Sequence, residues 1–417
     1  MSHISNLDAV PDCDKSALSM QISTLQIHHP YQPPAGFAAV PAPVHKASTV
    51  IFANVAAMRE RNWAHKGGYT YGLHGTPTTF TLEARIATLE GGAFCTLAPS
   101  GLAAVALADM AFLQAGDELL IPDNAYGPGK ALAAGELAGW GITHRFYDAM
   151  QPGDLAAKLS PATRLVWLEA PGSVTLEFPD IPALTALIKA HNAGTNEQRH
   201  RNGCISVLDN TWGAGIAFNA FELGADVSVQ ALTKYPSGGG DVLMGSVVTQ
   251  SEALHQQIHA CHMRTGLGIA ANDAELVLRG LQTMALRYAA QDAATRTLAT
   301  WMQQHSSVAC VLHPALPDSP GHATWQRDCT GAACLFSVVF DSQFTSLEID
   351  RFCDSLRLFK LGYSWAGPMS LCVPYDMPTL RSVVAWPHAG VLVRFSIGLE
   401  AVEDLKADLL QALSHLE

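Results

Sequence analysis

The feature that most constrains the fold is an alternation, beginning near Thr76, between helical patterns and short apolar runs. The runs have the length and β-branched content of strands buried on both faces. The helical patterns are Phe80–Leu89 and Gly101–Phe112, and the apolar runs are Glu118–Pro122, Arg164–Leu168 and Cys204–Leu208. Such an alternation predicts an α/β domain whose mostly parallel sheet is covered by helices.

The chain before this domain has a different character. A proline-rich stretch, His28–Pro34, is followed by Pro41 and Pro43. Proline fixes the backbone and interrupts helices and sheets, so residues 1–75 are predicted to form an extended arm more than a folded unit. Arms of this kind usually lie on another subunit.

The chain after the α/β domain is predicted to form a smaller α+β domain. It begins with a long Ala- and Gln-rich helical region after Leu281. Strand-like runs follow at Leu335–Phe340 and Val391–Phe395, and a last helix starts at Val402. The predicted division is an arm over 1–75, the α/β domain over 76–280 and a C-terminal domain over 281–417. The polar stretch 191–203 is predicted to be a surface loop.

Composition and charge limit the classes of partner. The chain has 417 residues with a formal net charge of −12, which argues against nucleic acid or an anionic membrane surface. No run approaches the roughly 20 apolar residues of a membrane span, and the N-terminus lacks the order of a signal peptide. The nine cysteines are scattered singly, as is typical of reduced thiols in a cytoplasmic protein. A small-molecule substrate is therefore expected.

Three segments together indicate a cofactor. They are a strand ending in Asp209, the segment Thr233-Lys234-Tyr235, and the turn Ser100-Gly101 that opens a helix. Each alone has an ordinary explanation, because a strand-terminal Asp is usually a cap, a Lys is usually solvated and Ser-Gly is a common helix start. Their combination matches the requirements of pyridoxal 5′-phosphate.

Each requirement has a candidate residue. The aldehyde of the cofactor needs a lysine that later serves as the local acid and base, here Lys234. The pyridine nitrogen needs a carboxylate to stay protonated, here Asp209. The phosphate needs backbone N–H groups at a helix N-terminus and a small hydroxyl. Gly101, Leu102 and Thr233 are the candidates for the phosphate, and Tyr126 is the candidate for stacking on the ring.

A family resemblance supports this interpretation. The chain resembles the trans-sulfuration enzymes, a pyridoxal-phosphate-dependent family of cysteine and methionine metabolism, and has the motif order of the cystathionine β-lyases. The matching segments are Tyr71–Thr78, Leu89–Gly92, Glu169–Ser173, Asp209–Trp212, Thr233–Tyr235, His313–Pro317, Ser364–Trp365 and Arg394–Glu400. They extend over nearly the whole chain.

The resemblance implies a fold-type-I architecture like that of aspartate aminotransferase. The α/β domain would be the cofactor domain, with a seven-stranded sheet, and the protein would be a homo-oligomer, at least a dimer and commonly a tetramer. By position, Lys234, Asp209 and Tyr126 match the residues that hold the ring, whereas Gly101, Leu102 and Thr233 match phosphate ligands. Arg394 matches the arginine that binds the substrate carboxylate. Tyr71 matches a tyrosine that reaches the active site of the partner subunit, where it is expected to bind the cofactor phosphate. The expected catalytic residues are Lys234, Tyr126 and Tyr71.

Three positions depart from the family pattern. Leu73 stands where relatives commonly have an arginine that binds phosphate across the subunit boundary, and His74, Arg59, Arg61 and Lys66 are candidates to replace it. Ala231 stands where many relatives have serine. Gly238–Asp241 replaces a common Gly-His-Ser-Asp sequence.

The segment Tyr363-Ser364-Trp365 favours one reaction. It resembles the β-lyases, so Ser364 and Trp365 are expected to contact substrate. The expected reaction is β-elimination of L-cystathionine or a related cysteine S-conjugate to a thiol, pyruvate and ammonia. Elimination or replacement at Cγ stays an alternative, because Trp365 could instead be a core aromatic residue and the following Ala366–Met369 departs from the commoner pattern.

The sequence gives little support to a dinucleotide site or a metal site. Gly266–Ala271 fits a relaxed dinucleotide-binding motif, but no strand precedes it in the sequence. His28 and His29 lack convincing partners at metal-ligand spacing, so no metal site is expected.

Overall fold

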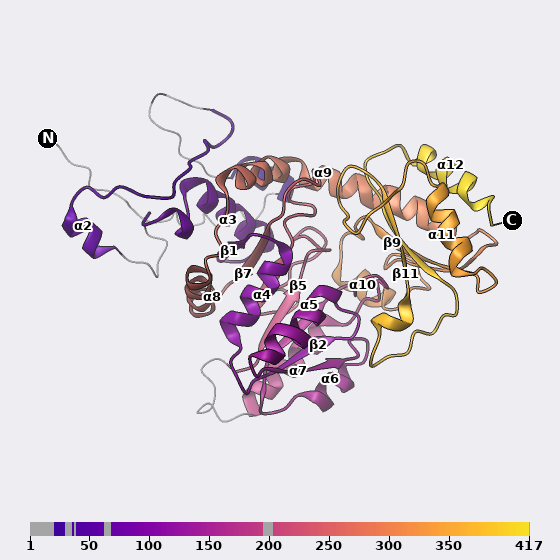
Figure 1. Ribbon diagram of the computed structural model, residues 1–417, viewed down its shortest axis with the longest axis horizontal. Helices are drawn as coiled ribbons and strands as arrows, with labels where there is room; N and C mark the ends of the chain where they lie inside the picture. Colours follow the sequence, from indigo (N-terminus) through magenta and orange to yellow (C-terminus); the bar gives the residue numbers. More distant parts are fainter. Residues whose placement is uncertain (1–20, 30–35, 37–38, 62–67, 195–202, 417) are drawn as a thin grey trace.

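The computed structural model describes residues 21–29, 36, 39–61, 68–194 and 203–416, which form two sheets with their covering helices (Figure 1). The strands of the larger sheet are β1 (Phe94–Ala98), β2 (Glu118–Pro122), β3 (Thr143–Tyr147), β4 (Thr163–Glu169), β5 (Ile205–Asp209), β6 (Val227–Gln230) and β7 (Gly245–Thr249). Their order is β1-β7-β6-β5-β4-β2-β3. Only β7 is antiparallel to its neighbours. The predicted mostly parallel, seven-stranded sheet is confirmed.

Helices cover both faces of this sheet, as the crossover connections of parallel strands require. They are α3 (Pro77–Glu90), α4 (Gly101–Phe112), α5 (Gly127–Leu132), α6 (Pro152–Lys158), α7 (Ile181–Gly194) and α8 (Glu252–Thr265). Successive side chains of β5 enter different cores, with Val207 in the core beneath α4 and Leu208 in the core beneath α3. The helix α7 continues to Gly194, so residues 191–194 of the predicted loop are helical, and 195–202 lie outside the described residues.

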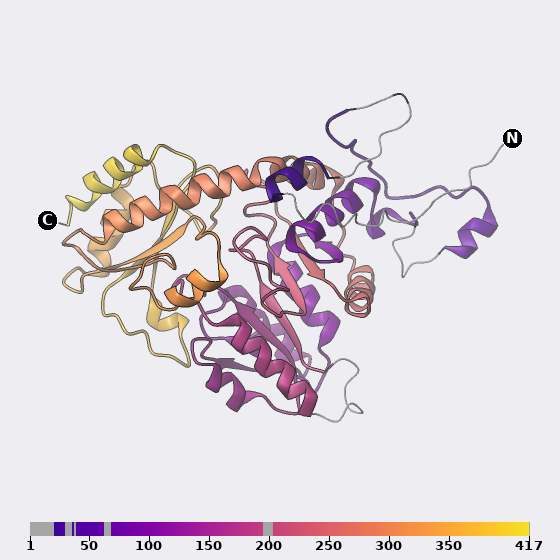
Figure 2. The same ribbon diagram turned by 180° about the vertical axis from the view of Figure 1, so that it is seen from behind.

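The second sheet is smaller and has the order β10-β11-β12-β9-β8. Its strands are β8 (Val308–Leu312), β9 (Leu335–Phe340), β10 (Lys360–Leu361), β11 (Leu371–Tyr375) and β12 (Leu392–Ser396). The helices of this region are α9 (Ala271–Met302), α10 (His322–Asp328), α11 (Ser346–Ser355) and α12 (Val402–Leu413). The long helix α9 runs from the larger to the smaller sheet (Figures 1 and 2), so the predicted division at 280/281 falls inside a continuous helix.

The N-terminal arm is partly helical, which differs from the prediction of an extended segment. Helix α1 (Ile22–Ile27) packs on α9, where the Gln26 amide contacts Met284 Sδ at 4.0 Å. The segment that carries α2 (Val55–Glu60) projects away from the larger domain (Figure 1). Residues 30–34 of the proline-rich stretch His28–Pro34 lie outside the described residues.

The expectations about membrane spans and cysteines can be compared with the described part of the chain. No described helix combines the length and the apolar character that a membrane crossing demands. The described cysteines are free thiols, whereas Cys13 lies outside the described residues.

The start of α4 is packed closely against the loop after β6. Ser100 caps the helix by accepting from Ala103 N at 3.0 Å. A methyl group added at Gly101 would lie 2.6 Å from the Ala231 side chain, far inside contact distance. Glycine is therefore required at this position by packing.

Substitution of Gly101 tests this close approach. Gly101→Ala should destabilise the protein by about 1–3 kcal/mol, because the added methyl forces α4 away from Ala231. Gly153→Ala is the matched control, since Gly153 also lies in the first turn of a helix but its Cβ would meet nothing within 4 Å. Thermal unfolding of both variants would check this, and equal midpoints would contradict the packing argument.

Candidate active site

The site forms at the carboxyl edge of the larger sheet. Strands β4 and β5 end in Glu169 and Asp209, which are paired in register. The loop after β2 carries Tyr126, and the loop after β6 carries Lys234. Parallel strands bring these loops to one edge, which is where ligands bind in open α/β sheets.

Asp209 is fixed by the turn that follows it. Its Oδ1 accepts hydrogen bonds from the backbone N and the hydroxyl of Thr211, at 2.9 and 2.5 Å. The Thr211 hydroxyl in turn accepts from Ala231 N at 2.9 Å, which ties the carboxylate to the lysine loop. Burial raises the pKa of Asp209, whereas the bonds from Thr211 and the nearby Lys234 oppose the rise.

Lys234 lies between the two domains. Its Nζ donates to Ser364 Oγ at 2.9 Å and lies 5.4 Å from the centre of the Trp365 ring. Burial, followed by the positive charge of Arg394, lowers the pKa of Lys234 to about 8. An amine with this pKa is partly neutral near neutral pH, as a nucleophile and a base require.

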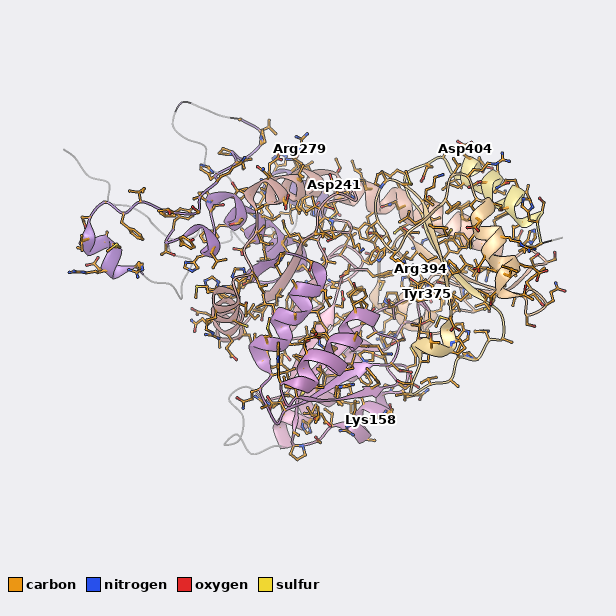
Figure 3. All side chains as sticks on the ribbon, viewed as in Figure 1. Lys158, Asp241, Arg279, Tyr375, Arg394 and Asp404 are labelled. Carbon is orange, nitrogen blue, oxygen red and sulfur yellow. The ribbon has the colours of Figure 1, made fainter. Side chains whose placement is uncertain are left out.

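Arg394 lies on β12, with only 6% of its surface exposed. Its Nη2 donates to the Tyr363 carbonyl at 3.0 Å, and its guanidinium lies 5.4 Å from the centre of the Tyr375 ring (Figure 3). Among the described residues its buried Nε has no hydrogen-bond partner. An unsatisfied donor on a buried guanidinium is suited to binding a carboxylate.

Two of the three candidate phosphate ligands in the cofactor domain, Gly101 and Leu102, lie at the start of a helix as expected, whereas the hydroxyl of the third, Thr233, is already hydrogen-bonded. The N–H groups of Gly101 and Leu102 lie in the first turn of α4, where no intrahelical acceptor is available. The Thr233 hydroxyl, however, donates to the Met244 carbonyl at 3.2 Å and accepts from Met244 N at 3.1 Å. Thr233 is therefore already engaged with the backbone.

Tyr126, in the loop after β2, has 41% of its surface exposed. Its backbone N donates to Glu169 Oε2 at 2.8 Å. Burial, then the charges of Asp209 and Glu169, raise the pKa of the phenol. The ring is thus close to the carboxylate expected to face the pyridine nitrogen.

Sequence reasoning missed a second buried carboxylate, Glu90. It is wholly buried and accepts from the side chains of Asn210, Ser228 and Gln230 at 2.6 to 2.9 Å. Burial raises its pKa, these three bonds oppose the rise, and Asp209 adds to it. The signal was present in β6, where Ser228 and Gln230 interrupt an otherwise apolar buried strand.

The arm residues do not reach this site within one chain. Tyr71 forms an isolated bridge with Thr49 and is 43% exposed, and no contact between the described residues joins it to Lys234. Leu73 packs beside Gly268. Of the basic residues considered as replacements for the family's arginine, His74 bonds to Thr70 and Arg61 to the Met58 carbonyl, whereas Lys66 lies outside the described residues.

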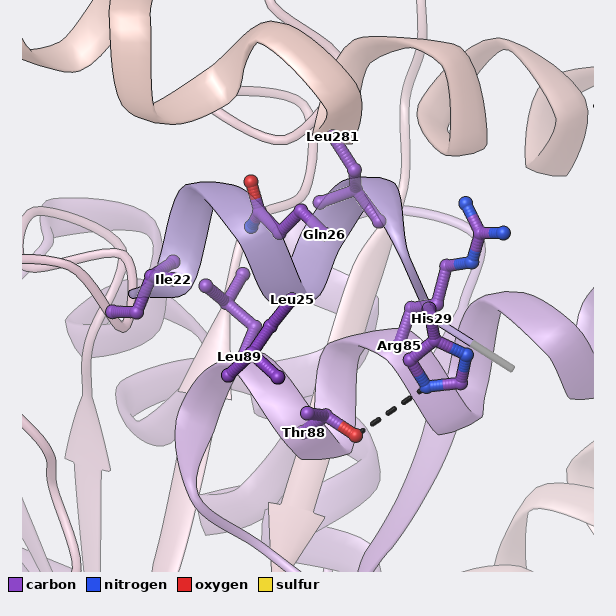
Figure 4. A pocket seen from close by; sticks show the side chains of 8 residues that line it. All are labelled: Ile22, Leu25, Gln26, His29, Arg85, Thr88, Leu89 and Leu281. Atoms are coloured by element: carbon purple, nitrogen blue, oxygen red, sulfur yellow. Dashed lines mark hydrogen bonds between the residues drawn. The ribbon is translucent and has the colours of Figure 1, made fainter. Parts of the chain in front are cut away.

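Two cavities among the described residues lie away from this site. One is lined by Ile22, Leu25, Gln26, His29, Arg85, Thr88, Leu89 and Leu281 (Figure 4) and has about 20 Å³, room for about one water molecule. A larger hollow of about 380 Å³ lies between the arm and the start of α9. Neither is lined by Lys234, Asp209 or Arg394. The relaxed dinucleotide motif at Gly266 follows a helix, α8, and forms no such site.

The chemistry of the donor set fits pyridoxal 5′-phosphate. A buried carboxylate, a buried amine of lowered pKa, two free N–H groups at a helix start and an aromatic ring lie at one sheet edge. These are the groups that the nitrogen, aldehyde, phosphate and ring of that cofactor need.

Comparisons with known proteins agree with this fit. The model of the family described as Cys/Met metabolism PLP-dependent enzyme matches residues 23–414. Cystathionine β-lyase of Salmonella typhimurium is 37% identical over 371 residues, or 88% of this chain and 91% of that protein. Cystathionine β-lyase MetC of Escherichia coli is 37% identical over 376 residues, or 89% of this chain and 92% of that protein.

A solved structure shares the fold. Cystathionine γ-synthase from Xanthomonas oryzae pv. oryzae, in complex with aminoacrylate and cysteine, has a TM-score of 0.85 at 29% identity and covers 95% of this chain and 98% of its own. The match confirms the fold-type-I architecture. With a family model over nearly its whole length and relatives at this identity, the chain belongs to the Cys/Met metabolism family of pyridoxal-phosphate-dependent enzymes.

Proposed function

We propose that this enzyme is a carbon-sulfur lyase that catalyses β-elimination of L-cystathionine or a related cysteine S-conjugate. The products would be a thiol such as homocysteine, pyruvate and ammonia. The observation that carries the proposal is the placement of Ser364 and Trp365 directly at the amine of Lys234. The relatives named cystathionine β-lyase support it. The structural similarity to a γ-synthase keeps reaction at Cγ as the second candidate.

Different residues of this chain would bind the cofactor and the substrate. Asp209 would hold the pyridine nitrogen protonated, Gly101 and Leu102 would bind the phosphate, and Tyr126 would cover the ring. When bound, the cofactor supplies a ring that accepts the electron pair left on Cα. Arg394 would bind the substrate carboxylate in a two-point fork and so direct the Cα–H bond toward Lys234.

Lys234 would move the protons. Its neutral Nζ would take the proton from Cα, and the electron pair left there would form a Cα–Cβ double bond as the Cβ–S bond breaks. The sulfur would leave with the bonding electrons and take a proton from the Lys234 ammonium to become the thiol. Addition of one water to the remaining enamine would give pyruvate and ammonia. Reaction at Cγ needs a second proton abstraction, at Cβ, so the same amine must travel further. The hydrogen bond to Ser364 and the adjacent Trp365 ring restrict that movement, which favours the β-lyase reaction.

The active site is proposed to be shared between subunits of a homo-oligomer, at least a dimer and commonly a tetramer. The arm exposes large apolar side chains, with Val40 91% and Ile51 87% exposed. Contact with a second copy would bury them and bring Tyr71 to the partner's Lys234.

The proposed units are the arm over 1–75, the cofactor domain over 76–280 and the C-terminal domain over 281–417, and the proposed location is the cytoplasm.

The first prediction concerns the pH dependence of Lys234 in the cofactor-free enzyme. Because burial and Arg394 disfavour the charged amine, its pKa should be about 8, with the amine neutral above that pH and protonated below it. Arg394→Met should raise the pKa. The rate at which Lys234 reacts with an amine reagent, followed by peptide mass spectrometry, measures this. A midpoint near roughly 10.4, the value of a free lysine, would contradict it.

The second prediction concerns the reaction. Lys234→Ala should abolish the absorbance band of the Schiff base between this lysine and the cofactor and lower turnover by about 10²–10⁴-fold or more. Lys158→Ala, which removes a surface lysine paired with Asp154, is the control. With the unaltered enzyme, cystathionine and cysteine S-conjugates should give pyruvate. Predominant 2-oxobutyrate would instead establish reaction at Cγ, and a fully active Lys234→Ala variant would refute the assignment of this lysine.

The third prediction concerns the shared site. Tyr71→Phe and Lys234→Ala should each be inactive, but a mixture that exchanges subunits should recover part of the activity. Hybrid dimers would contain one site with both native residues. Activity assays after exchange, with hybrids verified by native mass spectrometry, measure this. Verified hybrids without recovery would place Tyr71 outside the partner's site.

A further inference from the structure

A short segment of the C-terminal domain is bonded to the loop that carries Tyr126. The carboxylate of Asp123, at the end of β2, accepts from Ser382 N and Oγ at 3.0 and 2.7 Å through Oδ1. Its Oδ2 accepts from the backbone N of Val383 and Val384 at 2.9 and 3.1 Å. Burial alone would raise the pKa of Asp123, but these bonds hold it below its usual value.

A second connection runs through Arg381. Its Nη2 donates to Glu177 Oε2 at 2.7 Å and to Thr175 Oγ1 at 2.8 Å, and only 7% of the arginine side chain is exposed. Glu177 Oε2 also accepts from the Asn124 side chain at 2.8 Å. A well-buried pair of this kind holds its geometry more firmly than an exposed ion pair.

A third connection is made by Lys130. Its Nζ donates to the Asp123 carbonyl at 2.8 Å and to the Leu380 carbonyl at 3.0 Å. Four side chains of the cofactor domain therefore hold residues 380–384, which we name the interdomain clamp: those of Asp123, Lys130, Thr175 and Glu177. Tyr126 lies within the clamped loop, two residues after Asn124.

The position of the clamp in the fold links two parts of the active site. Residues 380–384 belong to the connection between β11 and β12. Those strands carry Tyr375 and Arg394, which stack on each other. The same connection thus joins the arginine expected to bind the substrate carboxylate to the loop of the tyrosine expected to cover the cofactor ring.

We propose that Asp123 and Arg381 are positioning residues, which act through the interdomain clamp to hold the Tyr126 ring at a fixed place relative to Arg394. The inference rests on the proposed function for the roles of Tyr126 and Arg394. Breaking the clamp lets the Tyr126 loop and the Arg394 strands move independently, so ring and substrate are aligned less often. A role in domain adhesion alone predicts lost stability without any dependence on Tyr126.

The test is a double-mutant cycle in the holoenzyme with Asp123→Asn and Tyr126→Ala. Asparagine keeps the size of the side chain but replaces one accepting oxygen by a donor. Asp123→Asn should lower kcat/KM by about tenfold to a hundredfold when Tyr126 is present. In the Tyr126→Ala background it should change kcat/KM by no more than about twofold, because the residue it positions is gone.

Arg327→Met is the matched control. Arg327, on α10, pairs with Asp180 of the cofactor domain at 2.9 Å and so also crosses between the domains. Within the described part of the chain its hydrogen bonds go to Asp180 and Asp328, and none goes to the Tyr126 loop. Its effect on kcat/KM should be within about twofold in both backgrounds. Ser382→Ala, which removes only the Oγ bond, is the milder variant if Asp123→Asn folds poorly, and its effect should have the same direction.

Hydrogen exchange supplies a readout that does not depend on activity. Asp123→Asn should speed exchange both in residues 380–384 and in 124–130 by about tenfold or more, whereas Arg327→Met should speed neither. Faster exchange confined to 380–384, or equal losses of kcat/KM with and without Tyr126, would overturn the inference. An enzyme that binds no pyridoxal phosphate would refute the proposed function instead, and exchange alone would then decide whether the clamp fixes the loop.

Discussion

The burial of ionisable groups at one edge of the larger sheet is the constraint on which the active site depends. Burial lowers the pKa of Lys234 and Arg394 and raises the pKa of Asp209 and Glu169. Buried charges persist only when they are paired or hydrogen-bonded. Arg394 has one carbonyl and one aromatic face as partners, and Asp209 has Thr211. A substrate carboxylate would pair with the Arg394 guanidinium, and a protonated pyridine nitrogen would pair with the Asp209 carboxylate. Each buried charge would therefore gain its ion-pair partner only when substrate or cofactor binds.

Features set by local sequence were predictable. The mainly apolar run Glu118–Pro122 is the buried strand β2, and the Ser100 start is the cap of α4. Asp209 ends β5 as expected, because a polar residue after a buried run marks the edge of a parallel sheet. The extended arm was predicted less well, since the helical turn at Ile22–Ile27 is stabilised by packing on α9 and not by its own sequence.

Interactions between distant segments could not be predicted in this way. Asp123 and the clamp residue Ser382 are separated by 259 positions, and no sequence pattern in either segment indicates that the two are in contact. The engagement of the Thr233 hydroxyl with Met244 depends on how the loop after β6 returns to β7, which no periodicity encodes. Glu90 resembles an ordinary helix residue until Asn210, Ser228 and Gln230 are seen to surround it.

The replacement of the family's arginine by Leu73 changes how the cofactor must be held. Leu73 packs on Gly268, and a leucine offers the phosphate no charge. The other proposed phosphate ligands are the N–H groups of Gly101 and Leu102 and the hydroxyls of Thr233 and Tyr71. The helix start that carries the two N–H groups supplies only about half an elementary charge. If the phosphate is bound more weakly, the orientation of the cofactor depends more on Lys234, Asp209 and the Tyr126 ring. The dense hydrogen bonding of Asp123 and Glu177 around the Tyr126 loop is consistent with that shift, because a ring that must orient the cofactor needs a rigid support of its own.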